Sequence, residues 1–190
     1  FAVSGTNIFA GSDAGVFLTT NNGNNWNSVN NGLTNVNISS LSVKGSNIYA
    51  GTKYGIFMSV NNGINWTASG LQDHDIISLI TISNNILAGT YGSGIFTSGN
   101  NGISWNQVNI GLRAQSVNAL EKSGNNLFAG TYGGIYISGN KGENWSSANN
   151  GLTNFFINSI IKEDNYLFAG SDSGVFVSSN NGSNWNTAGL

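Results

Sequence analysis

The chain has 190 residues, of which 39% are hydrophobic and only 7% are charged, and its formal net charge is −2 at pH 7. This length is enough to bury a core, whereas 6 basic residues are too few for the continuous positive surface that nucleic-acid binding requires. The chain has no cysteine, which excludes disulfides and thiolate metal sites, and no segment approaches the roughly 20 apolar residues of a membrane-spanning helix.

Tryptophan recurs along the chain at an almost constant interval. Trp26, Trp66, Trp105, Trp145 and Trp185 are separated by 40, 39, 40 and 40 residues. Self-similarity at this period is typical of repeat architectures. We therefore divide the chain, interpreted as a single domain over residues 1–190, into five successive units. The units are residues 1–33, 34–71, 72–112, 113–152 and 153–190.

Each unit holds four short apolar segments, and the second unit shows their order along the chain. The first is residues 41–43, the second lies in "NIYAG" at residues 47–51, the third is "GIF" at residues 55–57, and the fourth begins at Trp66. These segments are rich in β-branched and aromatic residues and are bounded by Gly and Asn, which is typical of strands. Helical repeats would need amphipathic stretches of about 10–15 residues without internal glycine, and the sequence has none.

The second and third segments of a unit do not alternate with polar residues, which indicates strands buried on both faces. A four-stranded sheet covered on both sides by copies of itself is a propeller blade. The sequence therefore predicts an all-β fold, a β-propeller of five four-stranded antiparallel blades. We expect either a ring of these five blades or five blades of a larger ring of about six or seven.

A turn of the form Ser/Thr-x-Asn-x-Gly-x-x-Trp joins the third and fourth segments of every unit. Its Asn side chain can bond backbone amides two residues on and tolerates a left-handed φ, and its Gly supplies a positive φ. We expect its Ser or Thr hydroxyl to form a hydrogen bond across the hairpin. We expect its Trp side chain to lie beneath the turn. We interpret the motif as a structural joint and not as a repeated sugar or calcium site, because calcium prefers carboxylates. The motif residues are Asn21, Gly23 and Trp26; Asn61, Gly63 and Trp66; Asn100, Gly102 and Trp105; Asn140, Gly142 and Trp145; Asn180, Gly182 and Trp185.

This motif resembles the Asp-box, or BNR repeat, of sialidases, sortilin-type receptors and photosystem II assembly factors, with Asn in place of Asp in all five copies. The whole unit is more similar to uncharacterised secreted bacterial repeat proteins, particularly those exported with a C-terminal sorting domain. The resemblance covers the entire chain. It implies a β-propeller in which the turn lies on the rim, away from the ligand face.

The loops at the other end of each sheet differ from unit to unit. Strand order places the loop between the second and third segments on the same face as the loop between units. Aromatic side chains there can stack on sugars or pack against peptide, and the few charges orient a ligand, although exposed loops also vary without any binding role. The predicted ligand-binding residues are Asp13, Lys53, Tyr54, Tyr91, Arg113, Tyr132 and Asp172.

Catalytic signatures are weak throughout the sequence. Sialidases hold their substrate with three arginines, whereas this chain has Arg113 alone. Asp13 and Asp172 occupy equivalent positions in the first and last units and could form a glycosidase-like pair, but nothing near them in sequence would tune a carboxyl for acid–base work. Asp73, His74 and Asp75 are more easily interpreted as an exposed loop than as metal ligands. We therefore predict no enzyme activity, no cofactor and no metal.

The prediction for function is a non-catalytic recognition or scaffold module that binds a glycan or a protein. We expect it to be extracellular or at the cell surface. The chain starts at Phe1 within a repeat, which indicates a processed or truncated product. We expect no nucleic-acid partner and no membrane span in the chain itself. Two alternatives stay open. The first is a self-assembling surface protein, since a nearly uncharged surface offers little repulsion between copies and open strand edges can pair. The second is a glycoside hydrolase-like enzyme.

Overall fold

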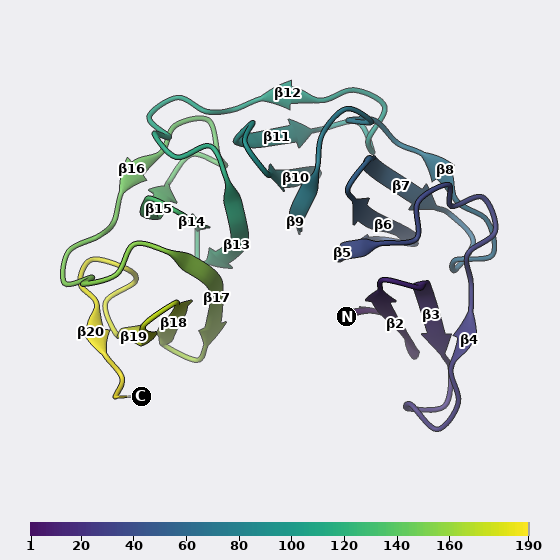
Figure 1. Cartoon of the computed structure of the whole chain (residues 1–190), viewed down its shortest axis with the longest axis horizontal. Coiled ribbons are helices and arrows are strands. Elements are labelled where there is room, and N and C mark those ends of the chain that lie inside the picture. Colours follow the sequence, from purple (N-terminus) through teal and green to yellow (C-terminus); the bar gives the residue numbers. More distant parts are fainter. Residues whose placement is uncertain (190) are drawn as a thin grey trace. The chain divides into compact units, whose positions relative to one another are not determined.

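A computed structural model describes residues 1–189, in which strands, turns and loops are present and no helix occurs. The strands form five separate antiparallel four-stranded sheets (Figure 1), and the prediction of five blades is confirmed. Each blade uses its four strands in chain order, so that every connection within it is a short hairpin.

The strands are as follows. The first blade holds β1 (Ala2–Ser4), β2 (Asn7–Ser12), β3 (Gly15–Thr19) and β4 (Asn27–Ser28). The second holds β5 (Ile38–Lys44), β6 (Asn47–Thr52), β7 (Gly55–Ser59) and β8 (Thr67–Ala68). The third holds β9 (Ile76–Ile82), β10 (Asn85–Thr90), β11 (Ile95–Ser98) and β12 (Asn106–Gln107). The fourth holds β13 (Val117–Ser123), β14 (Asn126–Thr131), β15 (Gly134–Ser138) and β16 (Ser146–Ser147). The fifth holds β17 (Ile157–Glu163), β18 (Tyr166–Ser171), β19 (Gly174–Ser178) and β20 (Asn186–Thr187).

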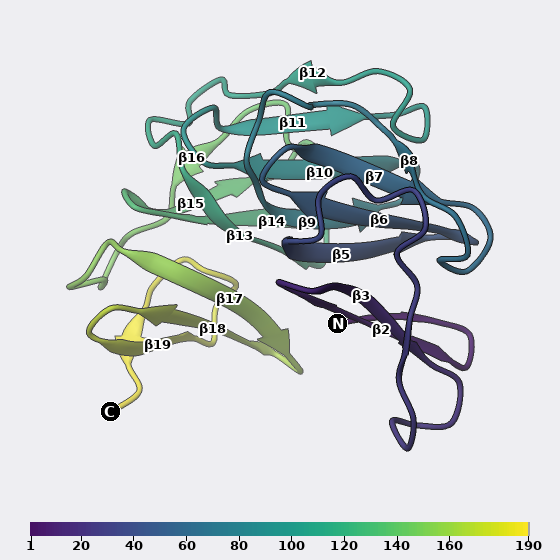
Figure 2. The same ribbon diagram turned by 45° about the vertical axis from the view of Figure 1, so that its right-hand side comes forward.

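The chain divides into two compact units, and the division falls within the third blade. The first unit takes Phe1–Ala88 and Ser98–Trp105, and the second takes Gly89–Thr97 and the residues from Asn106 onward. In the second unit, β17, β18 and β19 form one twisted layer (Figure 2).

The two middle strands of the second and fourth blades are buried as the sequence predicts, whereas β2 and β18 are only partly buried. In β6 and β14 every residue after the first is buried, so both faces of these strands are covered. Their side chains fill the space between neighbouring sheets. In the first unit Phe9, Ile48 and Trp66 belong to one cluster, and in the second unit Phe128 and Trp185 belong to another. Within each unit the core therefore lies between successive blades, so that neighbouring blades stabilise one another.

Two boundaries differ from the sequence prediction. The first strand of each of the later blades is longer than expected, and β5, β13 and β17 each contain a register shift, as between Ile38 and Ser40 in β5. The fourth strand does not begin at the tryptophan: β8 starts at Thr67, after Trp66, and has only 2 residues. The tryptophan is released from the sheet because its indole packs on the preceding blade.

First strands of successive blades lie side by side within a unit, β5 next to β9 and β13 next to β17. Side chains at the register shifts connect them. Asn118 Nδ2 donates to the carbonyl of Ile157 over 2.9 Å in the second unit, and Ser39 Oγ donates to the carbonyl of Ile76 in the first. These bonds satisfy backbone groups that the shift removes from the ladder.

Among the described residues there is no helix of the length and hydropathy needed to cross a bilayer.

Candidate functional site

The turn motif is held by one hydroxyl and one amide side chain in every blade. In the fifth blade Ser178 Oγ accepts the N–H of Gly182 over 2.9 Å and donates to Asn180 Oδ1 over 2.9 Å, and Asn180 Oδ1 also accepts the N–H of Asn184 over 2.9 Å. The same three bonds recur at the turns that begin at Thr19, Ser59, Ser98 and Ser138.

These bonds correct three details of the sequence interpretation. The hydroxyl stays inside its own turn and does not reach across the hairpin. The Asn side chain accepts from the amide four residues on, not two, because the loop is wider than an Asx-turn. The left-handed φ falls on the residue after the motif Asn, as at Asn181 (54°) and Lys141 (60°), and on the motif Gly, as at Gly182 (80°).

The motif Gly makes room for the preceding blade. A Cβ added to Gly182 would lie 2.5 Å from Cε1 of Phe128, which belongs to the fourth blade. In the first unit a Cβ on Gly63 would lie 3.4 Å from Cε1 of Phe9. Glycine is therefore required by contact across blades as well as by its φ.

The motif Trp binds the preceding blade and does not sit beneath its own turn. Trp66 Nε1 donates to the carbonyl of Val29 over 2.7 Å, and Trp105 Nε1 donates to that of Ser69 over 2.7 Å. In the second unit Trp145 Nε1 reaches Val108 O at 3.0 Å and Trp185 Nε1 reaches Ala148 O at 2.9 Å. The motif is thus a joint between blades. Trp26, in the first blade, is 39% exposed and makes no such bond among the described residues.

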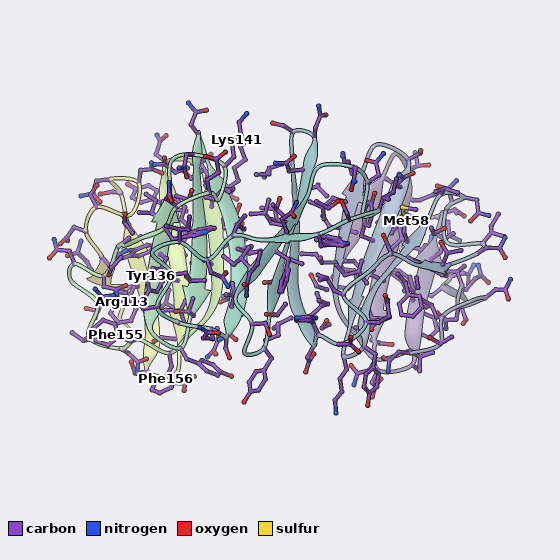
Figure 3. All side chains as sticks on the ribbon, turned by 90° about the horizontal axis from the view of Figure 1, so that it is seen from above. Met58, Arg113, Tyr136, Lys141, Phe155 and Phe156 are labelled. Carbon is purple, nitrogen blue, oxygen red and sulfur yellow. The ribbon has the colours of Figure 1, made fainter. Side chains whose placement is uncertain are left out.

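The variable loops lie on the other face, as Figure 3 shows for the second unit: Arg113, Phe155 and Phe156 are on one side and Lys141, in a turn motif, is on the opposite side. The loop between blades folds over the hairpin that joins the two middle strands. The N–H of Gly134 donates to the carbonyl of Phe155 over 2.8 Å, and that of Gly94 donates to Gln115 O over 2.7 Å. These backbone bonds bring the two kinds of loop together.

A hollow on this face of the second unit contains the only arginine of the chain. It has a volume of about 350 Å³, and it adjoins a second hollow of about 510 Å³ that shares Arg113 and Tyr136. The side chains of Arg113, Gln115, Ser116, Tyr132 and Tyr136 line the first. Ser146, Ser147 and Asn149 line the second.

Aromatic rings extend the hollow along the surface. The rings of Tyr132 and Phe156 are 5.8 Å apart between centroids and tilted by 54°. Both side chains are exposed, and Phe155 beside them is exposed as well. A guanidinium next to several aromatic rings can hold a carboxylate or an aromatic ligand group.

Sequence reasoning named Arg113 and Tyr132 but missed Tyr136 and Phe156. Tyr136 was hidden because it lies in a strand, where the other blades have Phe17, Phe57, Phe96 and Phe176. The extra hydroxyl at this one position is the signal that could have identified it. Phe156 is half of an unusual Phe-Phe pair in an exposed loop, which is also visible in the sequence.

The other predicted residues are placed elsewhere. In the first unit Lys53 Nζ lies 5.8 Å from the centroid of the Tyr54 ring, and Asp13 is exposed on its own loop. In the second unit Tyr91 is exposed, and Asp172 Oδ1 accepts a hydrogen bond from Asn158 Nδ2 over 2.6 Å. Asp13 and Asp172 belong to different units.

The loop at residues 73–75 has a structural role through its backbone. The carbonyl of His74 accepts the N–H of Gly55 over 3.0 Å, and the N–H of His74 donates to Leu71 O over 2.9 Å. Within residues 1–189 no group of three or more His, Cys, Asp or Glu side chains is placed to hold a metal ion.

One carboxyl group has a displaced pKa. Burial raises the pKa of Glu121 in β13 above its ordinary value of 4.5, against the lowering effect of hydrogen bonds from the backbone of Lys122 and Lys162 and of the Lys162 charge. Glu121 lines neither of the two hollows.

Four-stranded blades joined by an Asx-Gly-Trp turn define the class of BNR or Asp-box-like β-propellers, and this chain is of that class. It belongs to the DUF6242 beta propeller domain family, whose model matches residues 4–117. No curated protein matches the sequence.

Several solved structures share the fold. The extracellular domain of BT4673 from B. thetaiotaomicron is 23% identical with a TM-score of 0.77, and the match covers 93% of this chain and 26% of that one. An ancestral GH74 enzyme is 21% identical with a TM-score of 0.79, over 96% of this chain and 29% of that one. YCF48 bound to D1 peptide is 15% identical with a TM-score of 0.74, over 97% of this chain and 64% of that one. This chain therefore spans less than two thirds of each.

Proposed function

We propose that this β-propeller is a non-catalytic recognition module, extracellular or at the cell surface, that binds a protein segment at the hollow of Arg113, Tyr132 and Tyr136. The observation that carries the proposal is the position of the only arginine, which borders two adjoining hollows beside two tyrosines. Arg and Tyr are enriched among the residues that dominate protein-binding energy.

The exposed rings support a protein ligand over a small polar one. Tyr132, Phe155 and Phe156 are each about half exposed, at 47%, 47% and 50%. Together they present an apolar strip beside a cation, which suits a peptide with an apolar side chain and a carboxylate. YCF48, a structure of similar fold, is bound to a peptide, and the extracellular domain of BT4673 is a precedent for the location.

The chemistry of the hollows supports a role without catalysis. General acid–base hydrolysis of a glycoside requires two carboxyl groups placed about 5–10 Å apart across the bond. Neither hollow is lined by Asp, Glu or His. The fold shared with GH74 enzymes does not supply these groups, because function depends on the site and not on the fold.

A peptide-display selection tests the proposal. A library of random linear peptides would be selected on the immobilised chain, and the affinities of the enriched peptides would be measured against two variants. We expect Arg113→Gln to weaken binding about tenfold or more. The matched control is Lys141→Asn, which removes one cation from the opposite face and restores the residue that the other turns carry. Equal loss in both variants, or no enriched peptide, would overturn the proposal.

Glycan binding is the second candidate, favoured by one observation. Tyr54, Tyr91 and Tyr132 occupy the same loop in three successive blades and are all exposed. A glycan array would be compared between the chain and its Tyr54/Tyr91/Tyr132 to Ala triple variant. Binding that disappears in the variant would establish a lectin and contradict the protein-ligand proposal.

A further inference from the structure

A larger, polar hollow lies within the second unit on the face of the turn motifs, the side on which Figure 3 shows Lys141. Its volume is about 740 Å³, which is the size of a small-molecule site. Residues from three loops line it: the hairpin between β13 and β14, the hairpin between β17 and β18, and the turn motif of the fifth blade. We name it the hairpin hollow; its residues lie within 123–126, 162–167 and 179–181.

A buried hydroxyl in the hairpin hollow has no protein partner. Ser123 lines the hollow and is only 7% exposed, and its side chain forms no hydrogen bond within residues 1–189. Buried polar side chains are nearly always hydrogen-bonded, to protein or to an ordered molecule beside them. A serine hydroxyl can donate one bond and accept two. Ser123 therefore offers its hydrogen-bonding capacity to whatever enters the hollow.

The first unit shows what fills the equivalent place there. Lys44 ends the first strand of the second blade, as Ser123 ends that of the fourth. Its Nζ donates to the carbonyl of Asn84 in the hairpin of the third blade, and over 2.8 Å to Asn101 Oδ1 in the turn motif of that blade. The residue equivalent to Asn101 in the fifth blade is Asn181, which lines the hairpin hollow and whose side chain forms no hydrogen bond in the described part of the chain. A serine in place of the lysine thus leaves an acceptor facing the hollow.

Serine at this position does not by itself produce the same lining. The first blade also ends its first strand in serine, at Ser4. The neighbouring second blade, however, has an apolar side chain or none at three positions that are polar in the hairpin hollow. These are Val43, Gly45 and Val60, which are equivalent to Lys162, Asp164 and Ser179 of the fifth blade.

The lining fits a neutral ligand that carries many hydroxyl groups. Amide and hydroxyl side chains make up most of it, and an amide offers both donors and acceptors. Its two charged residues, Lys162 and Asp164, have opposite signs, so the lining has no net charge that would select an ion. Lys162 Nζ donates to the carbonyl of Asp164, and its ammonium group has further N–H donors for a ligand. The one large apolar residue of the lining is Leu167.

We propose that the hairpin hollow binds a short neutral saccharide, whose hydroxyl groups form hydrogen bonds with Ser123, Lys162 and Asn181. The saccharide occupies the place that the Lys44 side chain fills in the first unit. No aromatic ring lines the hollow to stack on a sugar, and each hydrogen bond gained replaces one to water. We therefore expect a dissociation constant of about 1 mM. This site is independent of the peptide hollow at Arg113, which lies on the opposite face.

Nitrogen-15 NMR spectra of the whole chain, titrated with cellotriose, maltotriose, chitotriose and mannotriose, test the proposal. We expect at least one of these sugars to give saturable shifts of the Ser123 amide and of the Asn181 side-chain amide. Asn181→Gly removes that side chain while its backbone, at φ 54°, suits glycine, and it should weaken binding about tenfold. The matched control is Asn62→Gly, the same change at φ 56° in the turn beside Val60, and it should bind the sugar as the wild type does.

A blocking variant and two comparisons complete the experiment. Ser123→Lys introduces the side chain that fills the equivalent place in the first unit, and it should abolish the sugar shifts while the rest of the spectrum is kept. The Tyr54/Tyr91/Tyr132 to Ala triple variant should bind as the wild type does, which separates this site from a glycan site on the tyrosine loops. The proposal would be overturned by equal binding in Asn181→Gly and Asn62→Gly, or by no shift with any of the four sugars at about 50 mM. Larger shifts with inorganic phosphate or n-butylamine than with the sugars would also overturn it, in favour of a charged ligand.

Discussion

The indole nitrogen of Trp185 donates a hydrogen bond of 2.9 Å to the carbonyl oxygen of Ala148, which lies 37 residues earlier in the neighbouring blade. Trp185 is 1% exposed. Trp145 forms the equivalent bond with the carbonyl of Val108, which also lies in the preceding blade. The most regular residue of the sequence therefore stabilises the contact between repeats.

Replacing this tryptophan should cost far more stability than replacing the first one. Trp185→Ala leaves a large cavity and an unpaired carbonyl, and we expect a loss of about 3–5 kcal/mol in the free energy of unfolding. Trp26→Ala, at an exposed position that has no equivalent bond within residues 1–189, should cost less than about 1 kcal/mol. Urea titrations followed by circular dichroism would measure both, and equal losses would show that the contact between blades contributes little.

Alanine at the motif glycine should be destabilising for two reasons that a control can separate. In Gly182→Ala the new Cβ meets the Phe128 ring at 2.5 Å and the backbone stays at φ 80°. Gly124→Ala has a similar left-handed backbone, φ 59°, with nothing within 4 Å. We expect a cost of about 1–2 kcal/mol for the control and about 1–3 kcal/mol more for Gly182→Ala. Thermal unfolding would give the difference in stability between Gly182→Ala and Gly124→Ala. This difference would be near zero if the Phe128 ring can move away from the new Cβ.

Lys141 is the one residue other than Asn at its position in the five turns. It has φ 60°, where Asn22, Asn62, Asn101 and Asn181 have φ between 54° and 59°. Asn tolerates this region better than Lys. We expect Lys141→Asn to raise the free energy of unfolding by about 0.5–1 kcal/mol, and the reverse change Asn181→Lys to lower it similarly. A change of the same sign in both variants would contradict this account.

Replacing the motif asparagine by aspartate should not lower the free energy of unfolding. The substitution introduces the residue that the Asp-box has at this position. The Asn180 Oδ1 atom acts only as an acceptor, from Ser178 and Asn184. A carboxylate at Asn180→Asp accepts the same bonds more strongly, so its pKa should be lowered in the folded state. The added stability should be present at neutral pH and disappear as the pH falls through the titration of this group. Unfolding midpoints of variant and wild type at several pH values would show whether the gain is lost on acidification.

Glu121 should make the protein less stable as the pH rises above 4.5. Burial raises its pKa, so the folded state binds its proton more tightly than the unfolded state does. The free energy of unfolding then falls as the pH rises from 4.5 to the raised pKa, and stays at the lower value above it. Glu121→Gln keeps the acceptor for the Lys122 N–H, and we expect it to be more stable than wild type at neutral pH. A pH profile that is unchanged in the variant would assign the slope to another group.

The sequence predicts the number of blades and their strands because hydrophobic segments, glycines and tryptophans recur at a fixed interval. It does not reveal the partner of each tryptophan. A turn that ends in Trp is equally compatible with an indole beneath its own hairpin, as we expected, and with one that reaches Ala148 or Val29 in another blade. Only the twist and spacing of neighbouring sheets decide between them.

The sequence likewise predicts only part of the candidate site. Arg113 and Tyr132 stand out in variable loops, and strand order places these loops on one face. Tyr136 lies in a strand whose pattern suggests only packing, and its contribution to the hollow depends on how the loop at Gln115 folds over Gly94. That backbone bond of 2.7 Å has no signature in the sequence.

A joint that is split between consecutive repeats affects how such a protein can evolve. Each period of about 40 residues encodes both halves of the joint. Its backbone carbonyl and its aromatic ring contact the following blade, and its motif glycine and tryptophan contact the preceding one. Duplication or deletion of one whole period within the array therefore regenerates a complete joint wherever it occurs, with no compensating substitution. Lengthening of the array by unequal recombination would be neutral for packing, and the loops of the new copy would be free to diverge.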